Sequence, residues 1–264
     1  MPPSDGGPRW RLVCDGDHPG ALNMARDWVL LEGAAGGAPA TLRLYGWDPP
    51  CLSLGRHQGT DAADLEFCRS AGIDVVRRPT GGRAVLHHLE LTYAVIAPLD
   101  RHPLPAALQD AYRRICTGLV AACRELGVAA QLTGGEVNLD LPGPRTVVPC
   151  FKAPAGGEVV VGGRKLIGSA MRAHDGAVLQ HGAILLDWDS ELQAGSMGLD
   201  DDHGLRPFVT TLSEQLGRLP GRGDLEAALA SGLSRMLGVT FEPSDLSPAE
   251  AARAHALAGS FRIE

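Results

Sequence analysis

The sequence has no long hydrophobic run and few aromatic residues. Aromatics make up 5% of its 264 residues, and no apolar stretch approaches the roughly 20 residues that a helix needs to cross a bilayer. The N-terminal residues Met1–Pro8 also lack the basic and then apolar pattern of a signal peptide. These absences predict a cytoplasmic protein that does not use a membrane as a partner.

Paired cysteines and excess positive charge are missing as well. The six cysteines form no CxxC pair, which argues against a zinc ribbon or a disulfide framework in a chain of this size. The formal net charge is -7, whereas nonspecific nucleic-acid binding needs a basic surface. We therefore expect partners among small molecules and proteins, and none among nucleic acids.

Common nucleotide motifs are absent, and one apparent metal motif fails on geometry. No predicted strand is followed by GxGxxG or by GxxxxGKS/T, which disfavours a Rossmann unit and a P-loop. His87 and His88 are followed by Glu90 and suggest metal ligands, but adjacent residues on a strand point to opposite faces. We therefore predict no metal site.

Lysine is the rarer of the two basic residues. Of the 24 basic residues only Lys152 and Lys165 are lysines, and the other 22 are arginines. An ammonium is a compact charge that reaches a single atom, whereas a guanidinium is broad and always charged. A lysine in such an arginine-rich chain is therefore a candidate for a role that arginine cannot fill, and chance retention is the alternative.

The elements that the sequence does contain indicate an α+β fold. Hydrophobic periodicity and turn residues predict helices and strands in an irregular order, without the β-α alternation of a doubly wound sheet. Turns at Gly162-Gly163 and Asp175-Gly176 join the last three strands in an antiparallel meander. We expect a single domain with a core at about 19–216 and a C-terminal helical segment at about 222–264. The predicted helices are 19–32, 61–70, 106–126, 224–237 and 248–258, and the predicted strands are 41–46, 51–54, 73–76, 89–96, 158–161, 165–170 and 177–186.

The first predicted helix has a distinct apolar side. Leu22, Ala25 and Val29 recur at helical spacing, so this side is expected to face the core. Arg26 and Asp27 are then expected on the side exposed to solvent.

The most distinctive stretch runs from Arg77 to His88. Three arginines flank Gly81 and Gly82 between two apolar runs, which is the layout of a strand, a tight polar loop and a returning strand. Paired glycines permit positive φ and close approach of a ligand, while guanidinium groups bind carboxylate, phosphate or carbonyl oxygens. The stretch is therefore either a ligand-binding loop or a solvated hairpin turn with surface arginines.

Three later residues are candidates for chemistry, each with a structural alternative. Cys150 follows an irregular segment, 131–149, and is either a buried hydrophobe or a nucleophile whose pKa nearby cations lower. Lys165 begins a strand, either as a donor to a carbonyl or phosphate oxygen or as a solvated hairpin lysine. His181 lies in the middle of a strand, either as a base or substrate donor or as a structural histidine.

Four sequence blocks together resemble the lipoate-protein ligase A family. They are Ser53–Gln58, Arg77–His87, Gly163–Ala170 and Leu179–Gly182, and the resemblance covers roughly residues 21–187. It implies the α+β fold of biotin and lipoate protein ligases, in which a mixed, largely antiparallel sheet is flanked by helices. It also implies that residues 1–264 form a single catalytic domain.

The family contains two chemistries, and the residues near Cys150 distinguish them. Ligases use ATP and Mg and carry an Arg-Asn-Asp-type element shortly before the lysine strand. This sequence has Glu136–Asp140 there, followed by a long insertion that holds Cys150. The insertion resembles that of the cysteine-dependent octanoyltransferases, which need no cofactor. The sequence also ends without the extra C-terminal domain of many ligases.

The resemblance implies a reaction with a covalent intermediate. Octanoate would pass from acyl carrier protein, through a thioester on Cys150, to a lysine of a lipoyl domain such as the glycine-cleavage H protein. Lys165 and backbone N–H groups would stabilise the oxyanion, and His181 is a candidate base for Cys150. Three alternatives stay open: an ATP-dependent and Mg-dependent lipoate ligase, octanoyl transfer between lipoyl domains, and a non-catalytic acyl-binding module.

The same resemblance implies which residues bind the substrates. A basic patch that docks the acidic carrier and lipoyl domains has as its candidates Arg77, Arg78, Arg83 and Arg164. The expected catalytic residues are Cys150 and Lys165, and the expected substrate-binding residues are Arg77, Thr80, Gly81, Gly82, Arg83, His87, Gly168, Ser169, Ala170, Gln180, His181 and Gly182.

Overall fold

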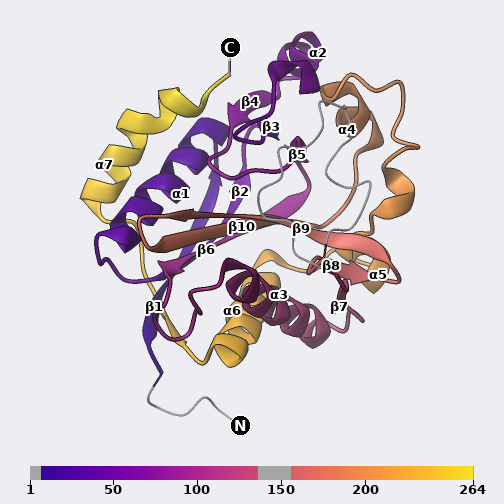
Figure 1. Ribbon diagram of the computed structural model, residues 1–264. Coiled ribbons are helices and arrows are strands. Elements are labelled where there is room, and N and C mark those ends of the chain that lie inside the picture. The colour runs from indigo at the N-terminus through magenta and orange to yellow at the C-terminus, as the bar shows by residue number, and fades with distance from the viewer. Residues whose placement is uncertain (1–6, 136–155, 264) are drawn as a thin grey trace.

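The computed structural model of the protein describes residues 7–135 and 156–263, which form two sheets. The strands of the large sheet are β1 (Arg9–His18), β2 (Thr41–Trp47), β6 (Glu90–Pro98), β7 (Gln131–Leu132), β8 (Val159–Val161), β9 (Arg164–His174), β10 (Ala177–Leu185) and β11 (Thr240–Pro243). Those of the small sheet are β3 (Cys51–Leu54), β4 (Asp74–Arg77) and β5 (Val85–His87). The strand orders are β11-β1-β2-β6-β10-β9-β8-β7 and β4-β3-β5 (Figure 1).

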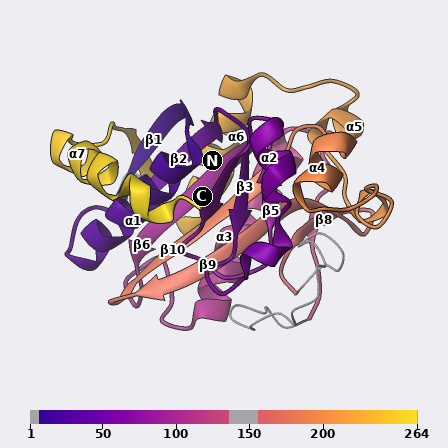
Figure 2. The same ribbon diagram turned by 90° about the horizontal axis from the view of Figure 1, so that it is seen from above.

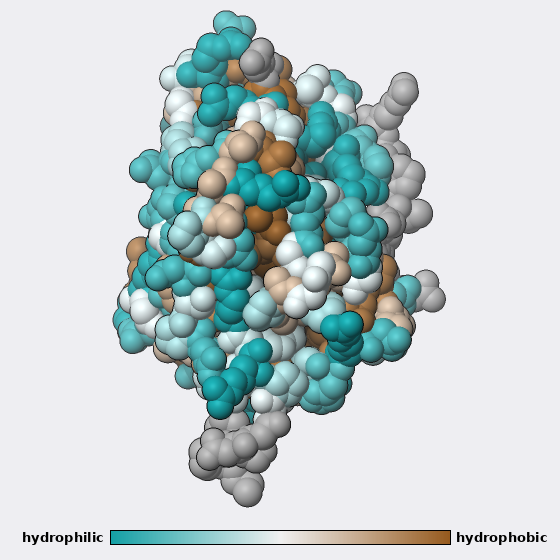
Figure 3. All heavy atoms as spheres, turned by 90° about the vertical axis from the view of Figure 1, so that its left-hand side faces the viewer, coloured by the Kyte–Doolittle hydropathy of each residue, from teal (hydrophilic) through white to brown (hydrophobic). Residues whose placement is uncertain are grey.

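Helices cover both faces of the large sheet. One face packs against α3 (Leu108–Glu125) and α6 (Arg222–Leu237), and the other against α1 (Gly20–Ala35), with α7 (Pro248–Leu257) outside it (Figures 1 and 2). The side that carries α7 is mostly hydrophilic, with apolar residues in narrow bands (Figure 3). No helix in residues 7–135 and 156–263 has the length and apolarity to span a bilayer. The shorter helices are η1 (Thr60–Ala62), α2 (Leu65–Ser70), α4 (Ser190–Ser196), η2 (Arg206–Phe208), α5 (Leu212–Leu216) and η3 (Ala258–Phe261).

The large sheet is mixed and largely antiparallel. From β2 through β6, β10, β9 and β8 to β7, every neighbouring pair runs antiparallel. At the other edge, β1 runs parallel to both β2 and β11. The predicted fold class is confirmed. The predicted antiparallel meander is confirmed as well, and its strands are β8, β9 and β10.

Local sequence signals predicted several helix ends correctly, although the first helix, predicted at 19–32, continues to Ala35. The last helix begins with a capping box in which Ser247 and Glu250 bond each other's backbone N–H groups. The helix predicted at 61–70 is instead split, because the Asp64 side chain accepts a bond from Phe67 N and so starts α2 after η1 has ended.

Several strands escaped prediction, among them β1 and the edge strand β11, and β11 changes the description of the C-terminal segment. β1 carries charged residues without a clean alternation, and β11 has only four residues. Arg9 of β1 aligns with Thr240 of β11, more than two hundred positions later in the chain. Residues 222–264 therefore supply a strand to the main sheet as well as helices.

Helix α1 is buried on two sides, which makes one prediction wrong. Ala25 and Val29, on the predicted apolar side, pack against Ala254 of α7. Asn23 and Asp27 lie four residues apart on a second side, and both are 0% exposed. The expectation that Asp27 lies on the exposed side is therefore wrong, because that side of the helix packs on the sheet.

The stretch from Arg77 to His88 is not a hairpin. β4 runs parallel to β3 and β5 runs antiparallel to β3, so the two strands lie on opposite sides of β3 and do not pair with each other. The interpretation as a solvated hairpin turn is therefore wrong. The loop between β4 and β5 crosses the end of β3, beside the large sheet.

Candidate active site

A cavity lies between the two sheets, with a floor of small residues. It encloses about 530 Å³, including the part that is open to solvent. Gly168 and Ala170 of β9 and Ala183 of β10 line the floor, where their small side chains leave room above the sheet. Lys165 of β9 also lines the cavity. The small sheet and its loop contribute Ser53, Arg78, Gly82, Val85 and His87.

The arginines of the Arg77–His88 stretch bind the loop's own backbone. The guanidinium of Arg78 is buried and donates to the carbonyls of Ser53 at 2.8 Å, Gly81 at 2.7 Å and Arg83 at 2.6 Å. Arg77 donates to the carbonyls of Gly55 and Gln58. Because these donors satisfy carbonyls that a tight loop leaves without strand partners, Arg77 and Arg78 do not form the expected surface patch. The other two patch candidates, Arg83 and Arg164, are both half-buried, and Arg164 pairs with Glu214.

Gly82 is required by the geometry of this loop. Its φ is +91°, a region that residues with a side chain rarely adopt, and a Cβ there would lie 2.8 Å from Arg78 Nη2. A Cβ on Gly55 would in turn lie 2.0 Å from the Gly82 carbonyl oxygen. Gly55 and Gly82 thus serve close packing of the loop on β3, and Gly82 also lines the cavity.

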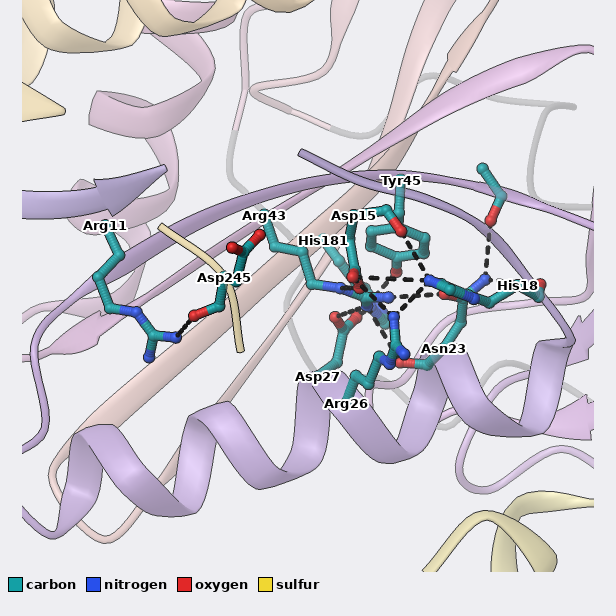
Figure 4. A network of polar contacts seen from close by, with 11 residues as sticks. Arg11, Asp15, His18, Asn23, Arg26, Asp27, Arg43, Tyr45, His181 and Asp245 are labelled. Atoms are coloured by element: carbon teal, nitrogen blue, oxygen red, sulfur yellow. Dashed lines mark hydrogen bonds and ion pairs between the residues drawn. The ribbon is translucent and has the colours of Figure 1, made fainter. Parts of the chain in front are cut away.

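His181 joins the loop to the sheet and to helix α1. Its Nδ1 donates to Asp27 Oδ2 at 2.9 Å (Figure 4). Its Nε2 lies 2.7 Å from the Thr80 hydroxyl. Burial lowers the pKa of His181, although the neighbouring carboxylate of Asp27 opposes this effect, and Arg78 and His87 lower it further. A neutral imidazole with Nδ1 protonated accepts the Thr80 proton at Nε2. His181 is thereby committed to structural bonds, and its candidate role as the base for Cys150 stays a prediction.

The lowered pKa of His181 predicts a pH-dependent stability. The unfolded chain takes up a proton on this residue as the pH falls below 6.5, its ordinary value, whereas the folded protein does not. The contribution of neutral His181 to the stability of the folded protein is therefore complete above this pH and is lost progressively as the pH falls further. Urea unfolding between about pH 5 and about pH 7.5 should show a smaller pH dependence in His181→Gln than in the wild type. Equal pH dependence of the two proteins would contradict the assignment.

Asp27 is the centre of a buried polar network. Its carboxylate accepts bonds from Arg43 at 2.7 Å, Tyr45 at 2.9 Å and His181 at 2.9 Å (Figure 4). Arg43 also bonds Asp15 at 2.7 Å and Asn23 Oδ1 at 2.6 Å. Burial alone would raise the pKa of Asp27, but the bond from His181 and the charge of Arg43 outweigh it and hold that pKa below its ordinary value.

A second histidine couples the small sheet to β6. His87 Nδ1 lies 2.9 Å from Glu90 Oε1, and His87 Nε2 lies 2.8 Å from the Ser53 hydroxyl. The ring of His87 stacks on Trp47 with a centroid separation of 4.0 Å, and Trp47 Nε1 donates to Thr92 Oγ1 at 2.7 Å. His87, Trp47 and Thr92 all line the cavity. These contacts hold one side wall in place.

Lys165 is fully buried at the cavity wall beside an acid. Its Nζ lies 2.5 Å from Glu158 Oε1, and Glu158 is 5% exposed. A buried carboxylate favours the charged form of the lysine. The interpretation of Lys165 as a solvated hairpin lysine is therefore wrong, and a charged ammonium at the edge of the cavity is what the geometry provides.

Gln180 lies on the opposite face of the sheet from His181. Its Nε2 donates to Tyr93 OH at 2.8 Å and to Cys116 Sγ at 3.3 Å, towards α3. Gly182, the next residue on the Gln180 side, is fixed by packing, since a Cβ there would lie 2.3 Å from the Gly168 carbonyl oxygen. Ser169 bonds Tyr93 OH at 2.7 Å and also reaches the cavity.

The structure brings together part of the set of residues expected from the sequence. The expected residues that do line the cavity are Gly82, His87, Lys165, Gly168, Ser169, Ala170, His181 and Gly182. The expected residues that are not among the described lining residues are Arg77, Thr80, Gly81, Arg83 and Gln180. Thr80 still contacts His181, and Gln180 still contacts Tyr93. Cys150 and Lys152 lie outside the described residues.

Several residues that line the cavity or belong to the network beside it were not predicted from the sequence. Asp27 and Asn23 carry one readable signal, since two polar residues four apart in a helix share a side. Their partners come from β2 and β10, and no local sequence pattern indicates contacts between such distant parts of the chain. Within the two described segments, no group of three or more His, Cys, Asp or Glu side chains has the geometry to hold a metal ion. The missed residues are Asn23, Met24, Asp27, Arg43, Tyr45, Trp47, Ser53, Val85, Thr92, Glu158 and Ala183.

Comparison with known proteins gives a consistent assignment of the chain. Residues 19–234 match the model of the lipoyl protein ligase A/B catalytic domain. The octanoyltransferase LipM of Symbiobacterium thermophilum is 40% identical over 94% of this chain and 93% of its own, and that of Kyrpidia tusciae is 38% identical over 96% of both.

Solved structures agree with the fold. A crystal structure of lipoate-protein ligase A bound with ATP superposes with a TM-score of 0.77 at 23% identity, covering 95% of this chain and 94% of that one. Protein Ta0514 from T. acidophilum, a putative lipoate protein ligase with bound lipoic acid, gives a TM-score of 0.75 at 22% identity, over 96% and 95% of the two chains. At these identities the likeness concerns the fold.

Proposed function

Because the chain belongs to the lipoyl protein ligase A/B catalytic domain family, we propose that it is an octanoyltransferase of lipoate biosynthesis that acts through Cys150. Its similarity to proteins named octanoyltransferase LipM, over nearly the whole length of both chains, supports this reaction over ATP-dependent ligation. The observation that carries the proposal is the cavity between the sheets, which has a floor of small residues and the buried Lys165 at its edge. An acyl chain fits such a floor, and a thioester carbonyl fits beside an ammonium.

The first half-reaction transfers the acyl group to the enzyme. The Cys150 thiolate attacks the carbonyl carbon of the octanoyl thioester of acyl carrier protein, and Lys165 stabilises the oxyanion that forms. The carbon–sulfur bond to the carrier then breaks, and the carrier thiolate takes a proton. The product is octanoyl-Cys150. Glu158, bonded to Lys165, helps to keep the lysine charged.

The second half-reaction transfers the acyl group to the acceptor. A deprotonated lysine amine of a lipoyl domain, such as that of the glycine-cleavage H protein, attacks the octanoyl-Cys150 carbonyl. An amide bond forms, the carbon–sulfur bond breaks, and the Cys150 thiolate is regenerated, while the amine loses a proton to solvent. No nucleotide takes part, and ATP, Mg and other cofactors are not needed.

Mass spectrometry tests the covalent step. Incubation with octanoyl-acyl carrier protein, without ATP, should add one octanoyl group to Cys150, and addition of a lipoyl domain should remove it. Cys150→Ala should form no adduct and transfer nothing. Cys14→Ala is the matched control, because Cys14 is exposed and its pKa is raised to about 11, mainly by partial burial and the nearby Glu226.

Other outcomes would identify the alternatives. A requirement for free octanoate or lipoate with ATP, together with unimpaired transfer by Cys150→Ala, would identify a ligase. Transfer from an octanoylated lipoyl domain but not from acyl carrier protein would identify an enzyme that moves octanoyl groups between lipoyl domains. Binding of octanoate without any transfer would identify an acyl-binding module.

A further inference from the structure

A row of four residues crosses the cavity floor, one from each of four neighbouring strands. The register aligns Gly168 of β9 with Ala183 of β10, Ala183 with Thr92 of β6, and Thr92 with Tyr45 of β2. All four line the cavity. Their side chains grow along the row, from none at Gly168 and a methyl group at Ala183 to an aromatic ring at Tyr45. The floor is therefore open at β9 and closed at β2.

We propose that the acyl chain lies along this row and that Tyr45 is the end wall that limits the chain to about eight carbons. The inference rests on the octanoyl transfer proposed above. Lys165 belongs to β9, the same strand as Gly168, so the carbonyl end of the chain lies at β9. The methyl end then points to β2, three strands away.

The length of the row matches an octanoyl group. Neighbouring strands lie about 4.8 Å apart, so three spacings separate the Cα atoms of Gly168 and Tyr45 by roughly 14 Å. Van der Waals contact at the end wall takes about 4 Å and leaves roughly 10 Å for the chain. An extended chain advances about 1.2 Å per bond, so an octanoyl group spans about 8 Å and a dodecanoyl group about 13 Å. The row therefore has room for an octanoyl group and is too short for a dodecanoyl group.

The middle of the row is suited to hydrocarbon although it contains a threonine. The Thr92 hydroxyl donates to Glu90 Oε1 at 2.5 Å and accepts a bond from Trp47 Nε1 at 2.7 Å. The hydroxyl proton and one of the two acceptor sites of Thr92 are therefore satisfied without a ligand. An apolar chain can lie on Thr92 without leaving the hydroxyl unpaired.

Tyr45 is a firm wall because buried charges hold it (Figure 4). Its hydroxyl donates to Asp27 Oδ2 at 2.9 Å, and the guanidinium carbon of Arg43 lies 3.8 Å from the ring centroid. Arg43 and Asp27 are both 0% exposed and pair at 2.7 Å. A longer chain would have to displace the ring and separate this ion pair, which costs more than the repacking of an apolar wall. The limit on chain length is therefore sharp.

Two substitutions should move the limit in opposite directions. The measurement is kcat/KM for acyl carrier protein thioesters from butanoyl to dodecanoyl. Ala183→Val fills the middle of the row, so the ratio of octanoyl to hexanoyl transfer should fall by about tenfold or more. Tyr45→Leu lowers the end wall, so the ratio of decanoyl to octanoyl transfer should rise by a similar factor. Ala173→Val, the same change at an exposed site on β9, is the control and should leave both ratios as in the wild type.

The outcomes separate this inference from the function on which it rests. Unchanged ratios in a folded Ala183→Val protein that still transfers octanoyl groups would overturn the inference and leave the function standing. A wild type that forms no octanoyl-enzyme would instead overturn the proposed function. Because Tyr45→Leu also removes an anchor of the buried network and can impair folding, Ala183→Val suffices for the decision by itself.

Discussion

Lys165→Ala is expected to transfer octanoyl groups at least about a hundredfold more slowly than the wild type, because it lacks the donor proposed to stabilise the oxyanion. Lys165 is fully buried and lines the cavity, so solvent is poorly placed to replace it. The loss should appear in kcat as well as in kcat/KM, since the oxyanion forms only as the reaction proceeds. Single-turnover formation of octanoyl-Cys150, followed by mass spectrometry, measures it directly.

Because Lys165 pairs with Glu158, this experiment needs controls for protein stability. Lys165→Ala removes the buried ammonium that pairs with Glu158 and can therefore destabilise the fold. Lys165→Met fills the same space without the charge, and the double variant Lys165→Met, Glu158→Gln removes both charges. If lost charge stabilisation is the cause, both should fold and both should remain slow. Transfer within about fivefold of the wild type by a folded Lys165→Met protein would contradict the role.

The sequence predicted the start of the last helix and the glycine loop well, because their signals are short-range. Ser247 and Glu250 formed the capping box that their spacing indicated. The glycines of the Arg77–His88 loop were expected to serve close approach, and Gly82 does have positive φ beside the cavity. Such features depend on the conformation of a few adjacent residues and can be read directly from the sequence.

The direction in which the loop arginines point could not be predicted. A guanidinium binds a ligand carboxylate and a backbone carbonyl equally well, so the sequence supports either role. The loop crosses the end of β3, where its carbonyls have no strand partners, and Arg77 and Arg78 supply the missing donors. The need for these hydrogen-bond donors can be seen only from the arrangement of β4 and β5 on either side of β3.

The buried network was missed for a related reason. Periodicity identifies an apolar side of a helix but not the element that covers it. The predicted apolar side of α1 packs on α7, and the side with Asn23 and Asp27 meets β2 and β10. Charges can be buried there because Arg43 and His181 arrive from distant parts of the chain, and their pairing is a property of the register.

Replacing Arg43 by methionine is expected to lower the free energy of unfolding by about 3–5 kcal/mol, because Asp27 then stays buried without its cation. Arg253→Met is the matched control. Arg253 also pairs with an acid of α1, Glu32, but its side chain is 57% exposed, and such surface pairs contribute less than about 1 kcal/mol. Urea unfolding of the two variants measures the difference. A cost for Arg43→Met as small as that of the control would contradict the importance of the buried pair.

The pH dependence of this cost identifies its cause. In the wild type the pKa of Asp27 is held below its ordinary value of 3.8, so its contribution to stability is present above that value and is lost as the pH falls through the lower, folded value. Without Arg43, burial raises the pKa of Asp27, and the carboxyl group becomes neutral at a higher pH. The stability difference between wild type and Arg43→Met should therefore be largest near neutral pH and shrink in acid. Asp27→Asn added to Arg43→Met should likewise restore at least about 1 kcal/mol, whereas a purely steric defect would persist in both experiments.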